Sequence, residues 1–233
     1  MKKIQIILVA ASLMMACDKT VNEQGIVDIF IGDEQSNTLR PNVYDRMMPT
    51  QNVYLQEFDN AATSGWSNKN DEYSQQGHEN GELVILGKKT HYAWLNYSGL
   101  NQTYDFQMEI RVQFNFITVS NTDTYMGIVW GVDNDKKTYH YLSLFNNANH
   151  TMHIGHYDGK NYTNLFAQAS NLAKNTHHIF TIRKVGNNMY FFANKRFIYQ
   201  TAYSSFPFNY GFLITASGIV FVDYVKIDYI EHL

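Results

Sequence analysis

The feature that most constrains the fold is an unbroken alternation of apolar and polar residues from Phe106 to Phe116. Because successive side chains of a β-strand point to opposite faces of the sheet, this pattern predicts a long strand, from Tyr104 to Ile117, with one buried face and one polar face. The apolar set is Phe106, Met108, Ile110, Val112, Phe114 and Phe116, and the polar set is Gln107, Glu109, Arg111, Gln113 and Asn115.

Shorter strand-like runs follow one another from Val53 to Ile230, separated by Gly, Asn and Asp, and no segment longer than a turn is typical of a helix. Three turns, 158–160, 186–188 and 194–195, join neighbouring runs as hairpins. The chain has 17 Tyr and 15 Phe but only 3 Pro, which favours strands. Many short antiparallel strands predict an all-β fold with two antiparallel sheets, a sandwich or jelly roll.

The first residues of the chain are typical of an exported lipoprotein. Lys2 and Lys3 precede an apolar run that is too short to span a bilayer, and Leu13 to Cys17 reads as a lipobox. Cys17 is the only cysteine in the chain, and we expect it to carry the lipid after cleavage. These residues predict a lipid-anchored protein in the outer or surface membrane of a bacterial cell envelope.

The chain is expected to divide into a signal peptide (1–16), a polar tether (17–50) and one folded domain (51–233). Part of the tether has an alternative interpretation, in which it packs as an edge strand. The formal charge is −3, and no basic cluster stands out, so nucleic acid is not an expected partner. The membrane contact is expected through the lipid on Cys17.

Several short motifs occur in a fixed order along the body of the chain. They are Glu57 to Asn60 with Gly65-Trp66, Gly81 to Ile85, Asp105-Phe106 with Glu109-Ile110, Gly127 to Gly131 with Tyr139 and Tyr141, Gly186 with Tyr190 to Asn194, Tyr210 to Phe212, and Val220 to Asp223. With these motifs in this order, the chain resembles the concanavalin A-like lectin and glucanase jelly rolls, above all the laminin-G-like and 3-keto-disaccharide-hydrolase-type modules. The resemblance implies a concanavalin A-like jelly roll, a fold that hosts lectins, glycosidases and inert spacers alike.

Catalytic carboxylate pairs are the first chemistry to look for in such a fold. Residues i and i+2 of one strand lie roughly 6.6 Å apart, a suitable separation for two glycosidase carboxylates. Glu57 and Asp59 have this spacing at the end of a strand, and Asp133 and Asp135 have it within a turn. The Glu-x-Asp-x-x-Glu signature of laminarinase-like glucanases is absent. The sequence therefore assigns no catalytic residue.

The spacing of the histidines does not support a metal site either. His150, His153 and His156 are three apart, and on a strand His153 and His156 point to opposite faces. Asp133 and Asp135 begin like a calcium loop, but Lys137 occupies the next ligand position. We expect no cofactor and no metal, although a zinc site assembled from distant strands stays open.

The polar face of the alternating strand is the predicted ligand site. Its side chains could hydrogen-bond sugar hydroxyls, while an aromatic ring from the central hairpin covers the sugar ring. A plain solvated sheet face is the alternative. The candidate ligand-binding residues are Gln107, Glu109, Arg111, Gln113, Trp130 and Tyr141.

Three functions remain open at this stage. The first is a non-catalytic glycan-binding or surface-interaction module on an envelope lipoprotein. The second is a hydrolase acting on glycosides, like the 3-keto-disaccharide hydrolases that the chain resembles. The third is a structural subunit that binds another envelope protein through an aromatic patch.

Overall fold

The computed structural model describes residues 47–59, 64–89, 91–97, 99–116, 124–147 and 150–232. These ranges contain strands and turns but no helix, and so no helix long and apolar enough to cross a membrane. The strands are β1 (Met47–Glu57), β2 (Lys69–Asn70), β3 (Ser74–Glu79), β4 (Glu82–Gly87), β5 (His91–Asn96), β6 (Phe106–Phe116), β7 (Tyr125–Asp133), β8 (Thr138–Phe145), β9 (Thr151–Tyr157), β10 (Tyr162–Ala169), β11 (His177–Val185), β12 (Asn188–Ala193), β13 (Arg196–Ala202), β14 (Asn209–Ile214) and β15 (Gly218–His232).

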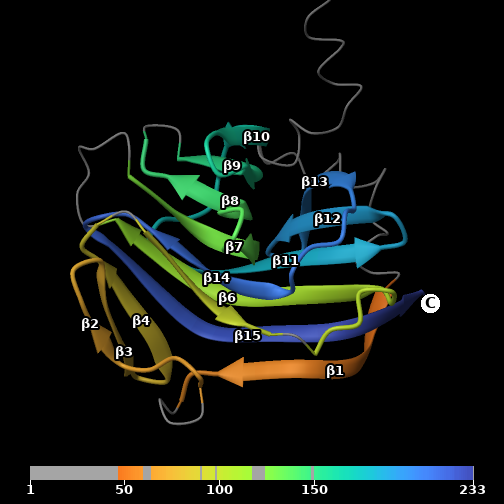
Figure 1. Cartoon of the computed structure of the whole chain (residues 1–233), viewed down its shortest axis with the longest axis horizontal. Helices are drawn as coiled ribbons and strands as arrows, with labels where there is room; N and C mark the ends of the chain where they lie inside the picture. The colour runs from red at the N-terminus through yellow and green to blue at the C-terminus, as the bar shows by residue number, and fades with distance from the viewer. Residues whose placement is uncertain are drawn as a thin grey trace, which may run out of the picture.

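The strands form two antiparallel sheets that pack face to face, as Figure 1 shows. The larger sheet has the order β13-β12-β11-β6-β15-β4-β3-β2, with β1 also paired to β15. The smaller sheet has the order β10-β9-β8-β7-β14-β5. The prediction of an all-β, two-sheet antiparallel sandwich is confirmed. The short strands β2 and β3 are additions that the sequence patterns did not reveal.

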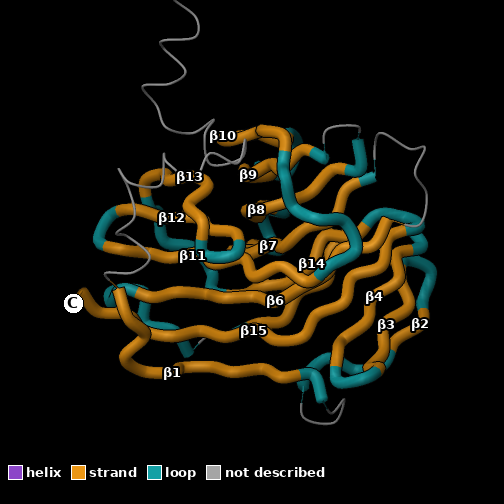
Figure 2. The backbone as a smooth tube through the Cα atoms, turned by 180° about the vertical axis from the view of Figure 1, so that it is seen from behind, coloured by secondary structure: helices purple, strands orange, loops and turns teal. Residues whose placement is uncertain are grey.

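Strand β15 organises one side of the larger sheet. Its first part pairs with β4, and its second part, from Tyr224 onward, pairs with β1. The register against β6 shifts between Val222 and Tyr224, at the point where one neighbour replaces the other. In Figure 2, β1 and β4 accordingly lie along different parts of the same side of β15.

The tether differs in part from its prediction. Strand β1 begins at Met47, so the last four residues of the predicted tether belong to the sheet, as the edge-strand alternative allowed. The signal peptide, Cys17 and the rest of the tether lie outside the described residues.

The alternation in β6 divides the strand between the core and the outside, as predicted. Phe106, Met108, Ile110, Val112 and Phe114 are buried in the hydrophobic core between the sheets. The polar residues between them point away from this core. The core includes side chains from both sheets, so the two buried faces stabilise each other.

The predicted hairpins are present as well. The turn between β12 and β13 places both Asn194 and Lys195 at positive φ, at 49° and 69°. Two consecutive residues with positive φ are the signature of a type I′ turn, whose twist matches that of the flanking strands. Asn tolerates this conformation well, which explains why a hairpin forms here without glycine.

Candidate functional site

The four predicted ligand residues on β6 all lie on its outward face. Their polar groups are already engaged by neighbouring side chains, however. Gln107 is only 2% exposed and donates to Asp228 Oδ2 at 3.0 Å. Arg111 pairs with Asp223, and Gln113 Nε2 donates to Asn115 Oδ1 at 2.8 Å.

Glu109 accepts a hydrogen bond from the Tyr224 hydroxyl at 2.8 Å. Burial raises the pKa of Tyr224, and the bond to Glu109 raises it further, so the tyrosine stays protonated and acts as the donor. The predicted polar row is thus a network of internal contacts rather than a line of free hydrogen-bonding groups.

A contact between side chains crosses the outward face of the larger sheet at this place. His177 on β11 and Glu82 on β4 are separated by β6 and β15 in the order of the strands. Their side chains nevertheless meet, with His177 Nε2 lying 2.5 Å from Glu82 Oε1. This contact covers part of the polar face that was predicted to bind a ligand.

The two predicted aromatic residues belong to the other sheet and point in opposite directions. Trp130 is 3% exposed and lies in the core, where its ring is 5.7 Å from that of Phe191. Tyr141 is buried in a separate apolar cluster, and its hydroxyl donates to Asn164 Oδ1 at 2.8 Å. The structure therefore does not bring Trp130 and Tyr141 together with the polar row of β6.

The metal candidates are also separated by the structure. His156 pairs with His140 on β8, whereas the ring of His153 contacts Phe145. Asp133 Oδ1 accepts from the backbone N–H groups of Asp135 and Lys136, as in an ordinary turn. Among the described residues, no group of three or more His, Cys, Asp or Glu is placed to hold a metal ion.

An open groove beside Tyr104 is the site that the sequence did not reveal. It has a volume of about 610 Å³ and lies between the start of β1, the loop before β6 and the end of β15. Tyr104 is 59% exposed, the largest value among the exposed large apolar side chains of the described chain. The residues lining this groove, called the Tyr104 groove below, are Thr50, Gln51, Thr103, Tyr104, Asp105, Tyr229, Ile230 and Glu231.

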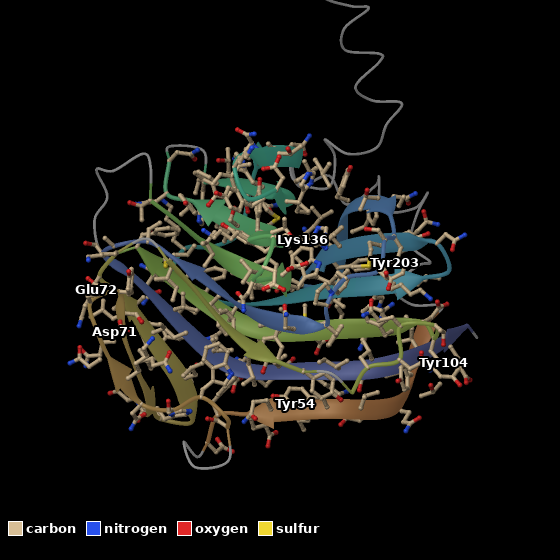
Figure 3. All side chains as sticks on the ribbon, in the orientation of Figure 1. Tyr54, Asp71, Glu72, Tyr104, Lys136 and Tyr203 are labelled. Atoms are coloured by element: carbon tan, nitrogen blue, oxygen red, sulfur yellow. The ribbon has the colours of Figure 1, made fainter. Side chains whose placement is uncertain are left out.

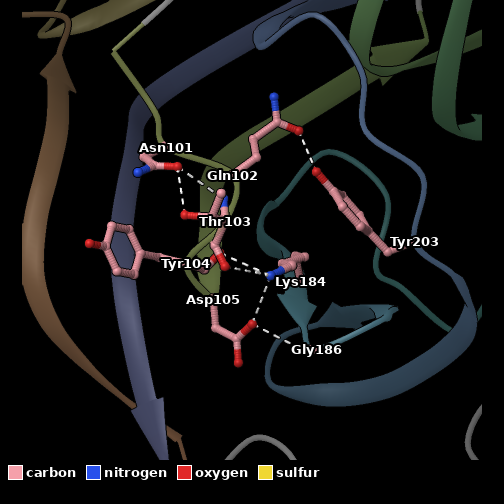
Figure 4. A network of polar contacts seen from close by, with 8 residues as sticks. All are labelled: Asn101, Gln102, Thr103, Tyr104, Asp105, Lys184, Gly186 and Tyr203. Atoms are coloured by element: carbon pink, nitrogen blue, oxygen red, sulfur yellow. Dashed lines mark hydrogen bonds and ion pairs between the residues drawn. The ribbon is translucent and has the colours of Figure 1, made fainter.

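The loop that carries Tyr104 is held in place by a network of hydrogen bonds (Figure 4). Lys184 Nζ donates to the carbonyl oxygens of Thr103 and Tyr104, at 3.3 and 3.2 Å, and to Asp105 Oδ1 at 3.0 Å. The N–H of Gly186 donates to the same carboxylate oxygen at 2.9 Å. Lys184 is buried, so it acts as an internal clamp on the loop rather than as a surface charge.

The start of the loop is fixed in a similar way. Asn101 Oδ1 accepts from the backbone N–H of Thr103 at 3.1 Å and from its hydroxyl at 2.8 Å. The N–H of Asn101 donates to the hydroxyl of Tyr229 at 2.9 Å, and the Tyr229 ring lies 5.3 Å from that of Tyr104. Tyr104 is thus presented to solvent on a backbone that is ordered before any ligand binds.

The predicted start of the strand at Tyr104 is wrong, because β6 begins only at Phe106. Tyr104 lies two residues before Phe106, in the phase that predicts a buried side chain, so periodicity alone does not indicate its exposure. The signal for a loop was the run Asn101 to Asp105, in which Asn, Thr and Asp are typical turn residues.

Comparison with known proteins shows which solved structures share this fold. No family model and no curated protein sequence matches this chain. A Bacillus subtilis protein of unknown function with a galectin-like fold aligns over 80% of this chain and 100% of its own, with a TM-score of 0.60 and 9% identity. The chain has a concanavalin A-like jelly-roll fold.

Two further solved structures share this fold. The Emp47p carbohydrate recognition domain covers 77% of this chain and 97% of its own, with a TM-score of 0.54 and 13% identity. The catalytic domain of an endo-1,3-β-glucanase (laminarinase) from Thermotoga petrophila covers 79% and 99%, with a TM-score of 0.52 and 14% identity. The predicted fold class is confirmed, and at such identities the similarity extends to the fold alone.

Proposed function

We propose that this chain is a non-catalytic glycan-binding module that holds a sugar in the Tyr104 groove. The observation that carries the proposal is an exposed tyrosine ring on an immobilised loop, bordered by hydroxyl and carboxylate groups. A sugar ring has an apolar face that packs on an aromatic ring, and hydroxyls that bind to polar groups at its edge. An ordered loop also lowers the entropic cost of binding.

The lining of the groove favours a neutral glycan. Asp105 and Glu231 offer carboxylate oxygens, which accept hydrogen bonds from sugar hydroxyls. An anionic sugar would meet like charge at these two residues, although Lys184 offsets the charge of Asp105 in part. The Emp47p carbohydrate recognition domain has the same fold and is a precedent for this use.

Replacing Tyr104 with alanine is expected to weaken glycan binding about tenfold, which corresponds to about 1.4 kcal/mol. The cause is loss of the apolar platform, while the clamp formed by Lys184 and Asp105 is left in place. Tyr104→Phe should retain most of the affinity, because the ring face is kept. The measurement is a calorimetric titration of residues 25–233 with a neutral glycan identified on a glycan array.

The matched control is Tyr73→Ala. Tyr73 is also exposed, but it follows Asp71 and Glu72, which lie at the opposite end of the molecule from Tyr104 in Figure 3. Its replacement should leave the affinity unchanged. Equal losses in the two variants, or no glycan binding by the native chain, would contradict the proposal.

We also propose that Cys17 carries a lipid that anchors this module to a bacterial envelope membrane. The support is the lipobox of residues 13–17 and the position of Cys17 ahead of the folded domain. Cys17→Ser is expected to abolish incorporation of a labelled fatty acid in the expressing bacterium. Incorporation that persists in this variant would exclude the anchor.

A further inference from the structure

A second cavity lies between the two sheets, on the side where their edge strands β10 and β13 are found. It has a volume of about 350 Å³ and is lined from both sheets. Figure 1 shows β8, β9 and β10 of the smaller sheet on one side of this region and β12 and β13 of the larger sheet on the other. The residues that define its character are Trp130, His140, His156, Met189, Phe191 and Phe206.

The inner wall of the cavity is made of aromatic rings. The indole of Trp130 stacks on the imidazole of His140, with centroids 5.7 Å apart and planes at 14°. The ring of Phe206 lies 5.7 Å from that of His140. Gly131 permits this arrangement, because a Cβ there would lie 3.0 Å from Phe206 Cβ and 3.1 Å from His140 Cδ2.

The outer part of the cavity reaches the surface. Leu165 lines it and is 41% exposed, since the register of β10 against β9 shifts at this residue, between Asn164 and Phe166. Thr201 of β13 lines it from the other sheet. A small molecule can therefore enter between the edge strands without separating the two sheets.

Two imidazoles supply the polar groups. The rings of His140 and His156 are 6.3 Å apart, and within the described chain neither forms a hydrogen bond to protein. Burial lowers the pKa of His140 to about 4, with a smaller effect from His156, so His140 is neutral near pH 7. A neutral imidazole has one nitrogen that can accept a hydrogen bond.

We propose that this cavity binds a two-ring aromatic molecule that carries a hydroxyl group. An apolar cavity of roughly 150 Å³ holds one benzene ring, so the present volume suits two fused rings. Aromatic walls favour flat aromatic ligands, and the imidazole of His140 accepts a hydrogen bond from the hydroxyl. The site is independent of the glycan groove, with which it shares no lining residue.

The test uses 2-naphthol and naphthalene as probes with the chain from residue 25 to 233, because every described strand is included. Binding of 2-naphthol is expected to change the fluorescence of Trp130, and its affinity is obtained by titration. Thr201→Phe should fill the mouth of the cavity and weaken binding at least tenfold. His140→Phe should weaken binding of 2-naphthol but not of naphthalene.

Gln200→Phe is the matched control for the mouth of the cavity. Gln200 precedes Thr201 on β13 but is exposed and does not line the cavity, so binding should be unchanged. Leu165→Trp provides a second obstruction on β10 if Thr201→Phe does not fold, as judged by circular dichroism. Tyr104→Ala should bind 2-naphthol normally, which separates this site from the glycan groove.

Three results would overturn the proposal. They are no binding of either probe to the native chain, unchanged binding in both folded obstructing variants, and equal losses in Thr201→Phe and Gln200→Phe.

Discussion

Replacing Ile110 with alanine is expected to lower the free energy of unfolding by about 2–5 kcal/mol. Ile110 lies near the middle of β6 and is 1% exposed, within the core shared by the two sheets. The change removes buried methyl and methylene groups and leaves a cavity that a sandwich core closes only in part. The measurement is urea unfolding followed by fluorescence and circular dichroism.

The neighbouring residue supplies the control. Arg111 lies on the opposite face of the same strand, and its ion pair with Asp223 is partly exposed. Arg111→Ala should therefore lower the free energy of unfolding by no more than about 1 kcal/mol. Similar losses at positions 110 and 111 would mean that the two faces of β6 are assigned wrongly.

Replacing Asp228 with alanine is expected to lower the free energy of unfolding by a similar amount, about 3–5 kcal/mol, but for an electrostatic reason. Asp228 is 1% exposed and accepts from Asn52 Nδ2 at 2.9 Å and from Gln107 Nε2 at 3.0 Å. Gln107 in turn accepts from Arg183 Nε at 2.9 Å. The carboxylate thus connects β1, β6 and β11 from its position on β15.

Loss of this carboxylate would leave the side-chain amides of Asn52 and Gln107 without their acceptor. It would also remove the ion-pair partner of Lys226, whose Nζ lies 3.2 Å from Asp228 Oδ2. Glu72→Ala is the matched control, because Glu72 also pairs with a lysine, Lys89, at 2.7 Å, but its side chain is 61% exposed. The free energy of unfolding of that variant should fall by at most about 1 kcal/mol. A small loss for Asp228→Ala, comparable to that of Glu72→Ala, would show that the buried network does not stabilise the fold. Unfolding in urea at neutral pH measures both.

The buried network also explains why Gln107, in the predicted polar row of β6, is not available to a ligand. Gln107 was predicted to face a ligand, and its outward direction on β6 is correct. In the folded chain, Arg183 and Asp228 occupy that space, and they lie 76 and 121 residues away along the sequence. Alternation identifies the face of a strand, but it carries no information on what another strand places above that face.

Trp130 shows a different limit of sequence patterns. Strand β7 is buried on both faces between its ends, with Val129 in the outer apolar cluster and Trp130 in the core. A strand of this kind is a continuous apolar run with no alternation to read. The sequence could therefore locate the aromatic residue on a strand without indicating whether its ring lies inside the sandwich or in a groove.

The two proposed sites have the same origin. The Tyr104 groove combines the start of β1, the loop before β6 and the end of β15, and the second cavity combines edge strands of opposite sheets. No local motif marks either combination. Each results from the order of the strands in the sheets, in which β1 joins the chain's last strand and β10 and β13 are left at the edges.

By itself, the sequence determined the class of fold, the two faces of β6 and the hairpin turns, because these depend on local periodicity and on the conformations that Asn and Gly tolerate. Tertiary structure alone decided that Gln107 is buried, that Trp130 lines a cavity between the sheets and that Tyr104 stands exposed in a groove. The physical reason is that exposure depends on contacts between residues far apart in the chain. Strand pairing fixes these contacts, and no short stretch of sequence encodes them.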